Sequence, residues 1–282
     1  MIKRAFFAGI ALLCSACSPV GVMNALIPSG GYRSYPDIAY QQGEERVLDL
    51  YVPAHGHSRG VVVFFYGGSW ESGHRQDYRF VAEALTARGY SVVIPDYRKY
   101  PDVVFPAFVE DAAAAVAWVH RHIAEYGGDP GRIFVAGHSA GAHLAALLAL
   151  DPHYLQAQGM SPMDLRGMIG LAGPYDFLPL QTARLNAVFP GEHLQFLSQP
   201  VNVLQTPNPP LLLLVGLKDN TVLPRNSESL AQHIQRAGGK AELRYFNDYG
   251  HINMVLKLAR PFRGDGHLLE TIVEFMNRQL AD

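Results

Sequence analysis

Apolar runs of strand length alternate with segments of helical periodicity from about residue 45 onward. Most of these runs are continuous, as expected when helices cover both faces of a parallel sheet. Residues 48–52 instead alternate between apolar and polar or tyrosyl side chains, as an outer strand would. This order predicts an α/β domain with a mostly parallel central sheet. The predicted strands with continuous apolar runs are residues 61–66, 92–94, 133–136, 168–172 and 211–215, and a further strand is predicted at 242–246.

Helices are predicted between these strands. Residues 77–88 place Val81 and Leu85 one helical turn apart, and residues 106–126 begin at a proline and end at two glycines. Later helices are expected at residues 226–237 and 267–280. Residues 151–210 separate two strands by more than a simple crossover needs, so we expect a small cap or pocket-wall insertion there.

Composition adds two constraints. The 282 residues are 49% apolar and 17% charged, which describes a globular chain able to bury one large core. The formal net charge is only -2 and the chain has no dense block of Lys and Arg, so no nucleic-acid partner is expected. The expected partner is a small, neutral molecule, and the sequence predicts no oligomeric state.

The N-terminus carries the pattern of an export signal. Two basic residues precede an apolar run that is too short to span a bilayer comfortably. The run ends in Leu13-Cys14-Ser15-Ala16-Cys17, which resembles the lipobox of bacterial lipoproteins, where cleavage before the cysteine leaves a thiol that carries lipid. We therefore expect a signal peptide at 1–16, lipidation of Cys17, and an exported protein anchored to a bacterial membrane on the outer-membrane or periplasmic side. Because Cys14 stands where that pattern usually has leucine, simple signal cleavage is the alternative.

The segment after the leader predicts a tether. Residues 17–44 contain several prolines and glycines and are expected to lead into the folded domain at 45–282. Both cysteines of the chain lie before this domain, so its stability is expected to depend on packing and not on disulfides.

A candidate nucleophile lies between a strand and a helix. The apolar run that begins at Ile133 leads into Gly137-His138-Ser139-Ala140-Gly141 and then into an Ala/Leu-rich segment. Strand, Gly-x-Ser-x-Gly and helix in this order are typical of a nucleophile elbow, in which the glycines allow a tight turn that exposes the serine hydroxyl. The alternative is a glycine-rich turn with an incidental serine, which the flanking strand and helix disfavour.

A base and an acid follow Ser139 in the order Ser, Asp, His that this kind of site requires. Asp219 comes just after the strand at 211–215, and His251 lies in the loop after the strand at 242–246. Asp248 competes with Asp219 but is expected to cap a turn, and His267 is the competitor of His251. With these three residues the predicted chemistry is acyl transfer through a covalent intermediate. The N–H of Ala140, directly after the nucleophile, is expected to meet the oxyanion.

A second motif makes a family resemblance specific. Tyr66-Gly67-Gly68-Ser69-Trp70 resembles the His-Gly-Gly-x-Trp motif of carboxylesterases in the hormone-sensitive-lipase and kynurenine-formamidase-like part of the α/β-hydrolase superfamily, which includes BD-FAE-like esterases. Pro95-Asp96-Tyr97-Arg98 and Phe105-Pro106 match the stretch that follows, and the resemblance covers residues 45–280. It implies the α/β-hydrolase fold with about eight strands, no metal or organic cofactor, and an oxyanion hole that includes Gly67 and Gly68.

Tyr66 departs from the family motif, which begins with histidine. In one interpretation it packs beneath the loop as the histidine would, and in the other its hydroxyl reaches the oxyanion or the substrate. Trp70 is expected near the mouth of the pocket.

The predicted function is that of a serine carboxylesterase acting on short-chain esters. An N-formylkynurenine formamidase, or another amidase or peptidase on the same three residues, is the alternative. A non-catalytic binding module is disfavoured because all three residue types occur in order.

Overall fold

The structure is a computed structural model that describes residues 27–28, 30–264 and 266–281. The predicted signal peptide and Cys17 lie outside these residues. None of the helices in the described part is long and apolar enough to cross a lipid bilayer.

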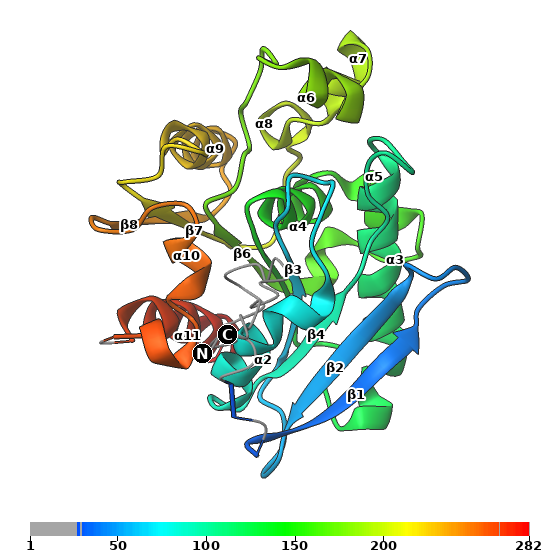
Figure 1. Cartoon of the computed structure of the whole chain (residues 1–282), viewed down its shortest axis with the longest axis vertical. Helices are drawn as coiled ribbons and strands as arrows, with labels where there is room; N and C mark the ends of the chain where they lie inside the picture. Colours follow the sequence, from blue (N-terminus) through cyan, green and yellow to red (C-terminus); the bar gives the residue numbers. More distant parts are fainter. Residues whose placement is uncertain (1–26, 29, 265, 282) are drawn as a thin grey trace, which may run out of the picture.

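An eight-stranded sheet runs through the molecule in the order β1-β2-β4-β3-β5-β6-β7-β8 (Figure 1). The first two strands pair antiparallel with their neighbours, and all strands from β3 to β8 are parallel. The α/β-hydrolase fold expected from the sequence is therefore confirmed. The strands are β1 Tyr32–Ala39, β2 Val47–Pro53, β3 Val61–Phe65, β4 Ser91–Pro95, β5 Ile133–His138, β6 Leu165–Leu171, β7 Leu211–Gly216 and β8 Ala241–Phe246.

Helices cover the sheet in two packed groups. One group is α3, α4 and α5, of which α4 packs on β5 and β6. The other is α2 and α11, where Arg88, two residues after the end of α2, forms an ion pair with Glu270 of α11. Every residue of β3, β4 and β5 is buried, which explains their continuous apolar sequences. The helices are η1 Arg75–Tyr78, α2 Arg79–Thr86, α3 Ala107–His122, η2 Ile123–Tyr126, α4 Ala140–Leu150, α5 Pro152–Gln156, η3 Pro162–Asp164, α6 Ala183–Val188, α7 Glu192–Leu197, α8 Pro200–Val203, α9 Arg225–Arg236, α10 Asn253–Leu256, η4 Arg260–Phe262 and α11 His267–Ala281.

The predicted tether is wrong from Tyr32 onward. Residues 32–39 form β1, the edge strand of the sheet, so β2 is an inner strand and not the outer strand that its alternation indicated. The register of β1 on β2 shifts between Tyr35 and Ile38, and most β1 side chains are exposed. An exposed edge strand that contains Pro36 carries no apolar pattern, which is why the sequence did not reveal it.

The predicted insertion at 151–210 is too long. Its first part contains α5, η3 and β6, so this stretch continues the sheet. Only the part after Leu171 leaves the sheet, where α6, α7 and α8 form a small cap beyond one end of the strands (Figure 1). The aromatic side chains of this part divide between core and surface, because Tyr175 and Phe189 are buried whereas Phe196 is exposed.

Candidate active site

Ser139 occupies a sharp turn between β5 and α4. Its backbone has φ 55° and ψ -122°, a conformation that L-residues rarely adopt and that persists only when the surrounding structure holds it. A Cβ at Gly141 would lie 2.0 Å from the carbonyl oxygen of Phe65, and one at Gly137 would lie 2.3 Å from the backbone of Gly141. The two glycines therefore allow β3, β5 and α4 to meet directly below the half-buried serine.

The structure brings Ser139, His251 and Asp219 together. Ser139 Oγ lies 2.9 Å from His251 Nε2, and His251 Nδ1 lies 2.8 Å from Asp219 Oδ2. The other oxygen of Asp219 accepts hydrogen bonds from the N–H groups of Thr221 at 2.8 Å and Val222 at 2.9 Å. Burial raises the pKa of Asp219, but the hydrogen bonds from His251 and the two N–H groups outweigh burial, so the pKa lies below its usual value. The ionised carboxylate can thus orient the imidazole.

The two competing residues lie elsewhere. Asp248 pairs with Lys218 at 2.6 Å on the surface, and the exposed fraction of its side chain is 81%. His267 begins α11 and packs beside the ring of Phe246, with 5.5 Å between the ring centroids.

The loop after β3 lies against the turn that carries Ser139. A Cβ at Gly67 would lie 3.1 Å from the Cβ of Ser139, and one at Gly68 would collide with Ser72 at 2.1 Å. Ala140 is the first residue of α4, where the N–H groups of the first turn have no acceptor within the helix. Gly67 and Ala140 are therefore neighbours of the serine in the structure, whereas Gly68, the next residue of the loop, packs against Ser72.

Ser69 is a residue that sequence analysis missed. It has a positive φ of 55° and lines the pocket together with Ser139 and Ala140. Its position is the variable one in the motif, so its identity carried no signal.

Tyr66 is fully buried and its hydroxyl is turned away from the pocket. The hydroxyl donates a hydrogen bond to Asp96 Oδ1 at 2.7 Å, and the ring stacks on Tyr97 with 4.9 Å between centroids. This placement supports the interpretation in which Tyr66 packs beneath the loop, and it argues against direct contact between its hydroxyl and the oxyanion.

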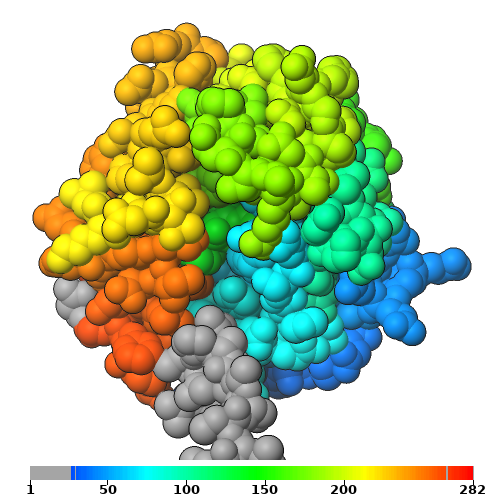
Figure 2. Space-filling model, turned by 45° about the horizontal axis from the view of Figure 1, so that its top comes forward, coloured from blue at the N-terminus to red at the C-terminus, as the bar shows by residue number. Residues whose placement is uncertain are grey.

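A small apolar pocket of about 210 Å³ opens beside Ser139. In Figure 2 a hollow lies between the cap in yellow-green, the loop after β3 in cyan, and the C-terminal half in yellow to orange. Trp70 forms one wall, as expected, with Phe177 stacked on it at 5.9 Å between centroids. The other lining residues, which the sequence did not identify, are Pro174, Leu185, Thr221, Val222 and Asn226.

Two buried histidines flank Ser139 and support its neighbours. His138 Nε2 lies 3.0 Å from the carbonyl oxygen of His251, and His143 Nε2 lies 2.6 Å from the carbonyl oxygen of Ser198. Trp70 Nε1 donates to His143 Nδ1 at 3.3 Å, which joins the pocket wall to α4. Burial lowers the pKa of His138 to about 3, with a contribution from His251, and burial lowers that of His143 to about 4. Both are neutral structural groups near pH 7.

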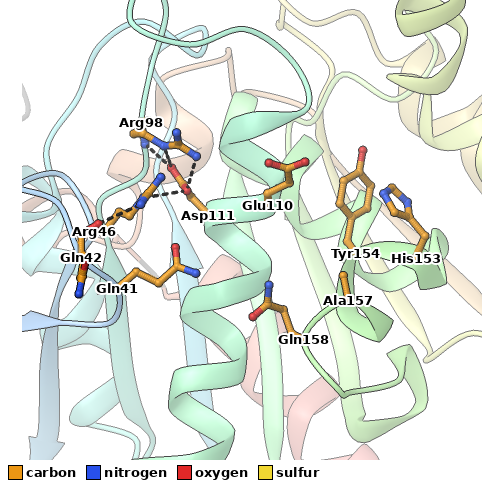
Figure 3. Close-up of a pocket in the computed structure, with 10 residues that line it drawn as sticks. All are labelled: Gln41, Gln42, Arg46, Arg98, Glu110, Asp111, His153, Tyr154, Ala157 and Gln158. Carbon is orange, nitrogen blue, oxygen red and sulfur yellow. Dashed lines mark hydrogen bonds and ion pairs between the residues drawn. The ribbon is translucent and has the colours of Figure 1, made fainter.

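A larger cavity, of about 560 Å³, lies away from Ser139 between α3, α5 and the β1–β2 loop (Figure 3). Two of its arginines gather at one carboxylate: Arg98 donates to both oxygens of Asp111 at 2.8 Å, and Arg46 Nε lies 3.3 Å from the same carboxylate. The residues around this cavity do not include a serine, and its histidine, His153, pairs with Asp151. The serine that lies within hydrogen-bond distance of a histidine, Ser139, lines the smaller pocket.

Metal-ligating side chains do not gather in the part of the chain that the structure describes: no three His, Cys, Asp or Glu residues there are grouped so as to hold an ion.

Three kinds of comparison relate the chain to known proteins. The BD-FAE family model matches residues 48–234. A probable isoprenylcysteine alpha-carbonyl methylesterase of Arabidopsis thaliana is 31% identical over 251 residues, which cover 80% of this chain and 52% of the relative. Esterase LipQ of Mycobacterium tuberculosis is 29% identical over 242 residues, which cover 77% of this chain and 58% of the relative. The chain thus spans between about half and two thirds of the length of these relatives.

Solved structures share the fold. A truncated carbohydrate esterase from gut microbiota superposes with a TM-score of 0.75 at 20% identity, covering 90% of this chain and 99% of that one. Esterase 2 of Thermogutta terrifontis with bound butyrate superposes with a TM-score of 0.71 at 26% identity, covering 88% of this chain and 94% of that one.

Proposed function

The chain belongs to the BD-FAE family of α/β-hydrolases, and from this premise we propose that it is a serine carboxylesterase with Ser139 as nucleophile, His251 as base and Asp219 as orienting acid. The observation that carries the proposal is the continuous pair of hydrogen bonds from Ser139 through His251 to Asp219, at 2.9 and 2.8 Å. Relatives named as esterases and carboxylic ester hydrolases support the reaction class.

The proposed reaction is acyl transfer in two steps. His251 Nε2 takes the proton of Ser139 Oγ as the oxygen attacks the ester carbonyl, and the same nitrogen then protonates the leaving alcohol. Water hydrolyses the acyl-enzyme by the same route. Loop N–H groups and that of Ala140 stabilise the oxyanion, and each such donor typically contributes roughly 3 to 4 kcal/mol to the transition state.

We propose short acyl groups as substrates. The pocket of about 210 Å³ is small and is lined by the rings of Trp70 and Phe177 and by Leu185 from the cap, so it offers little length to an acyl chain. The butyrate bound to the Thermogutta terrifontis esterase is of the same class.

A panel of p-nitrophenyl esters with rising acyl length tests the proposal, beside N-formylkynurenine and the methyl ester of a prenylated cysteine. We expect kcat/KM to be highest from acetyl to butyryl and to fall at least about tenfold for long chains, because the small pocket has little space for added methylenes. A preference for the formyl amide would favour a formamidase. The matched control is Ser139→Ala, which should lose both hydrolysis and labelling by a serine-directed fluorophosphonate. Absence of labelling in the folded wild-type protein would favour a binding module.

We further propose that the chain is exported and that Cys17 carries lipid, on the basis of the leader sequence alone. Cys17→Ser should move the protein from the membrane fraction to the soluble fraction when the full chain is expressed in a bacterium. Ester hydrolysis should be retained. Equal distribution of wild type and variant would contradict lipidation and support simple signal cleavage.

A further inference from the structure

The two ends of the loop that carries Gly67 and Gly68 meet at one carboxylate oxygen. The loop begins at Tyr66, directly after β3, and ends at Arg75, the first residue of η1. The Tyr66 hydroxyl donates to Asp96 Oδ1 at 2.7 Å, and the backbone N–H of Arg75 donates to the same atom at 2.9 Å. Both ends of the loop are therefore bound to the same oxygen atom.

Asp96 is itself held firmly. It follows β4 and is 5% exposed, and its second oxygen pairs with the guanidinium of Arg75. The same guanidinium donates to Asp49 of β2 at 2.8 Å, and the hydroxyl of Tyr40 donates to the backbone oxygen of Asp96 at 2.7 Å. Because every partner is buried or fixed in the sheet, the carboxylate is a rigid point of attachment.

The loop also packs over the ring of Tyr66, whose hydroxyl donates to Asp96. A Cβ at Gly73 would lie 2.8 Å from the ring of Tyr66, which is why the loop needs glycine there. The ring is also stacked between Tyr78 and Tyr97, and Tyr97 donates its hydroxyl to the carbonyl of Tyr66 at 2.9 Å. A displacement of Tyr66 would move the backbone of the loop directly.

The loop also contains backbone strain that needs support. Ser69 and Trp70 have positive φ values of 55° and 62°, and neither is glycine. Such conformations persist only where the surroundings over-determine them, and they are common at functional sites. The strained residues lie next to the pocket that contains Ser139.

We propose that Asp96 is a positioning residue for the reaction, which holds both ends of the loop through Tyr66 and Arg75 so that the loop N–H groups meet the oxyanion formed at Ser139. The inference rests on the proposed function and adds a role for the tyrosine that replaces histidine in the motif. The Tyr66 hydroxyl acts on the loop through Asp96 and touches neither the substrate nor the oxyanion.

The test measures kcat, KM and amide hydrogen exchange of residues 67–74 in Tyr66→Phe, Asp96→Asn, Asp96→Ala and the double variant Tyr66→Phe/Asp96→Ala. For Tyr66→Phe we expect kcat to fall about tenfold with KM within about twofold, because displacement of a positioned group by up to 1 Å can cost a hundredfold in rate. Exchange in the loop should become faster. Asp96→Asn keeps an acceptor oxygen and should lose less kcat than Asp96→Ala, and the double variant should be no slower than Asp96→Ala because both changes break one clamp.

The matched control is Tyr90→Phe, which removes another buried hydroxyl, bonded to Asn277 Oδ1 at 2.7 Å and outside the loop. It should leave kcat and loop exchange unchanged. The proposal is overturned if Tyr66→Phe keeps kcat within twofold of wild type. It is also overturned if kcat of Tyr66→Phe falls about a hundredfold while loop exchange stays unchanged, because the hydroxyl would then contact the oxyanion directly. If Asp96→Ala does not fold, the kcat values and loop exchange of Tyr66→Phe and Asp96→Asn test the proposal. If the wild type hydrolyses no ester, the proposed function fails, whereas loop exchange still tests the clamp.

Discussion

His138 and His143 differ from most histidines in that the protein keeps them neutral well below pH 6. Both are buried beside Ser139, which disfavours the charged ring, and each donates its Nε2–H to a backbone carbonyl, which places the proton of the neutral ring on Nε2. Their pKa values, about 3 and about 4, lie below the value of about 6.5 that histidine has in an unfolded chain. Two uncharged imidazoles, those of His138 and His143, therefore flank Ser139.

These lowered pKa values predict that acid destabilises the fold. Below pH about 6.5 the unfolded chain binds protons at both histidines while the folded chain does not, so the free energy of unfolding decreases as pH falls, by about 1.4 kcal/mol per pH unit for each histidine. His143→Gln removes one such group and should reduce this slope by about 1.4 kcal/mol per pH unit between pH 6.5 and 4. Urea unfolding at a series of pH values measures how the free energy of unfolding of each protein depends on pH.

An exposed histidine provides the control for this experiment. His233→Gln, in α9, should keep the wild-type slope. If His143→Gln also keeps that slope, the folded protein accepts a proton at His143 without cost and the ring is not required to be neutral.

At the scale of elements, the catalytic geometry depends on how closely α4 approaches β3. Gly141 lies at the contact, where the backbone of Phe65 and the carbonyl oxygen of Tyr66 occupy the space in which a side chain would begin. The close approach brings the N-terminus of α4, and with it Ala140, to the loop after β3. The sheet and the helix thus set the distance between two parts of the proposed oxyanion hole.

Gly141→Ala should disturb both stability and catalysis. The added methyl group meets the Phe65 carbonyl oxygen at 2.0 Å, so α4 must move, and overpacking of this kind typically costs about 1–3 kcal/mol. We expect that loss in urea unfolding, together with a fall in kcat of at least about tenfold because the donor at Ala140 shifts. Gly31→Ala, at a glycine with open space around it, should change neither quantity. Normal kcat in a destabilised Gly141→Ala would show that the helix position is not critical for the reaction.

At the scale of the whole molecule, the N-terminal strand is part of the scaffold. Tyr32 of β1 is 8% exposed and packs against Tyr51 of β2, and Asp37 of β1 pairs with the buried guanidinium of Arg75. The edge strand is therefore connected to the loop beside Ser139 through one arginine.

Removal of β1 tests this connection. A chain that begins at residue 41 should unfold at lower urea concentration than one that begins at residue 27, and should aggregate more readily because the inner strand β2 becomes an unpaired edge. Urea unfolding and light scattering measure the two effects. Equal stability of the two chains would support the tether that the sequence predicted for this segment.

The sequence by itself determined the parts of this protein in which neighbouring residues carry the signal. Continuous apolar runs identified the inner strands, and the elbow around Ser139 was evident because strand, turn and helix follow one another in the chain. Asp219 and His251 were predicted from their places after strands, since parallel strands bring their carboxyl ends to one edge.

Only the tertiary structure decided the features that depend on distant contacts. It identified β1, whose exposed side chains have no apolar pattern, and it limited the cap to the part after β6. It also decided the direction of the Tyr66 hydroxyl, because Asp96, 30 positions away in the chain, accepts its hydrogen bond. A side chain turns toward the partner that satisfies it when buried, and that partner is a neighbour in space and not in sequence.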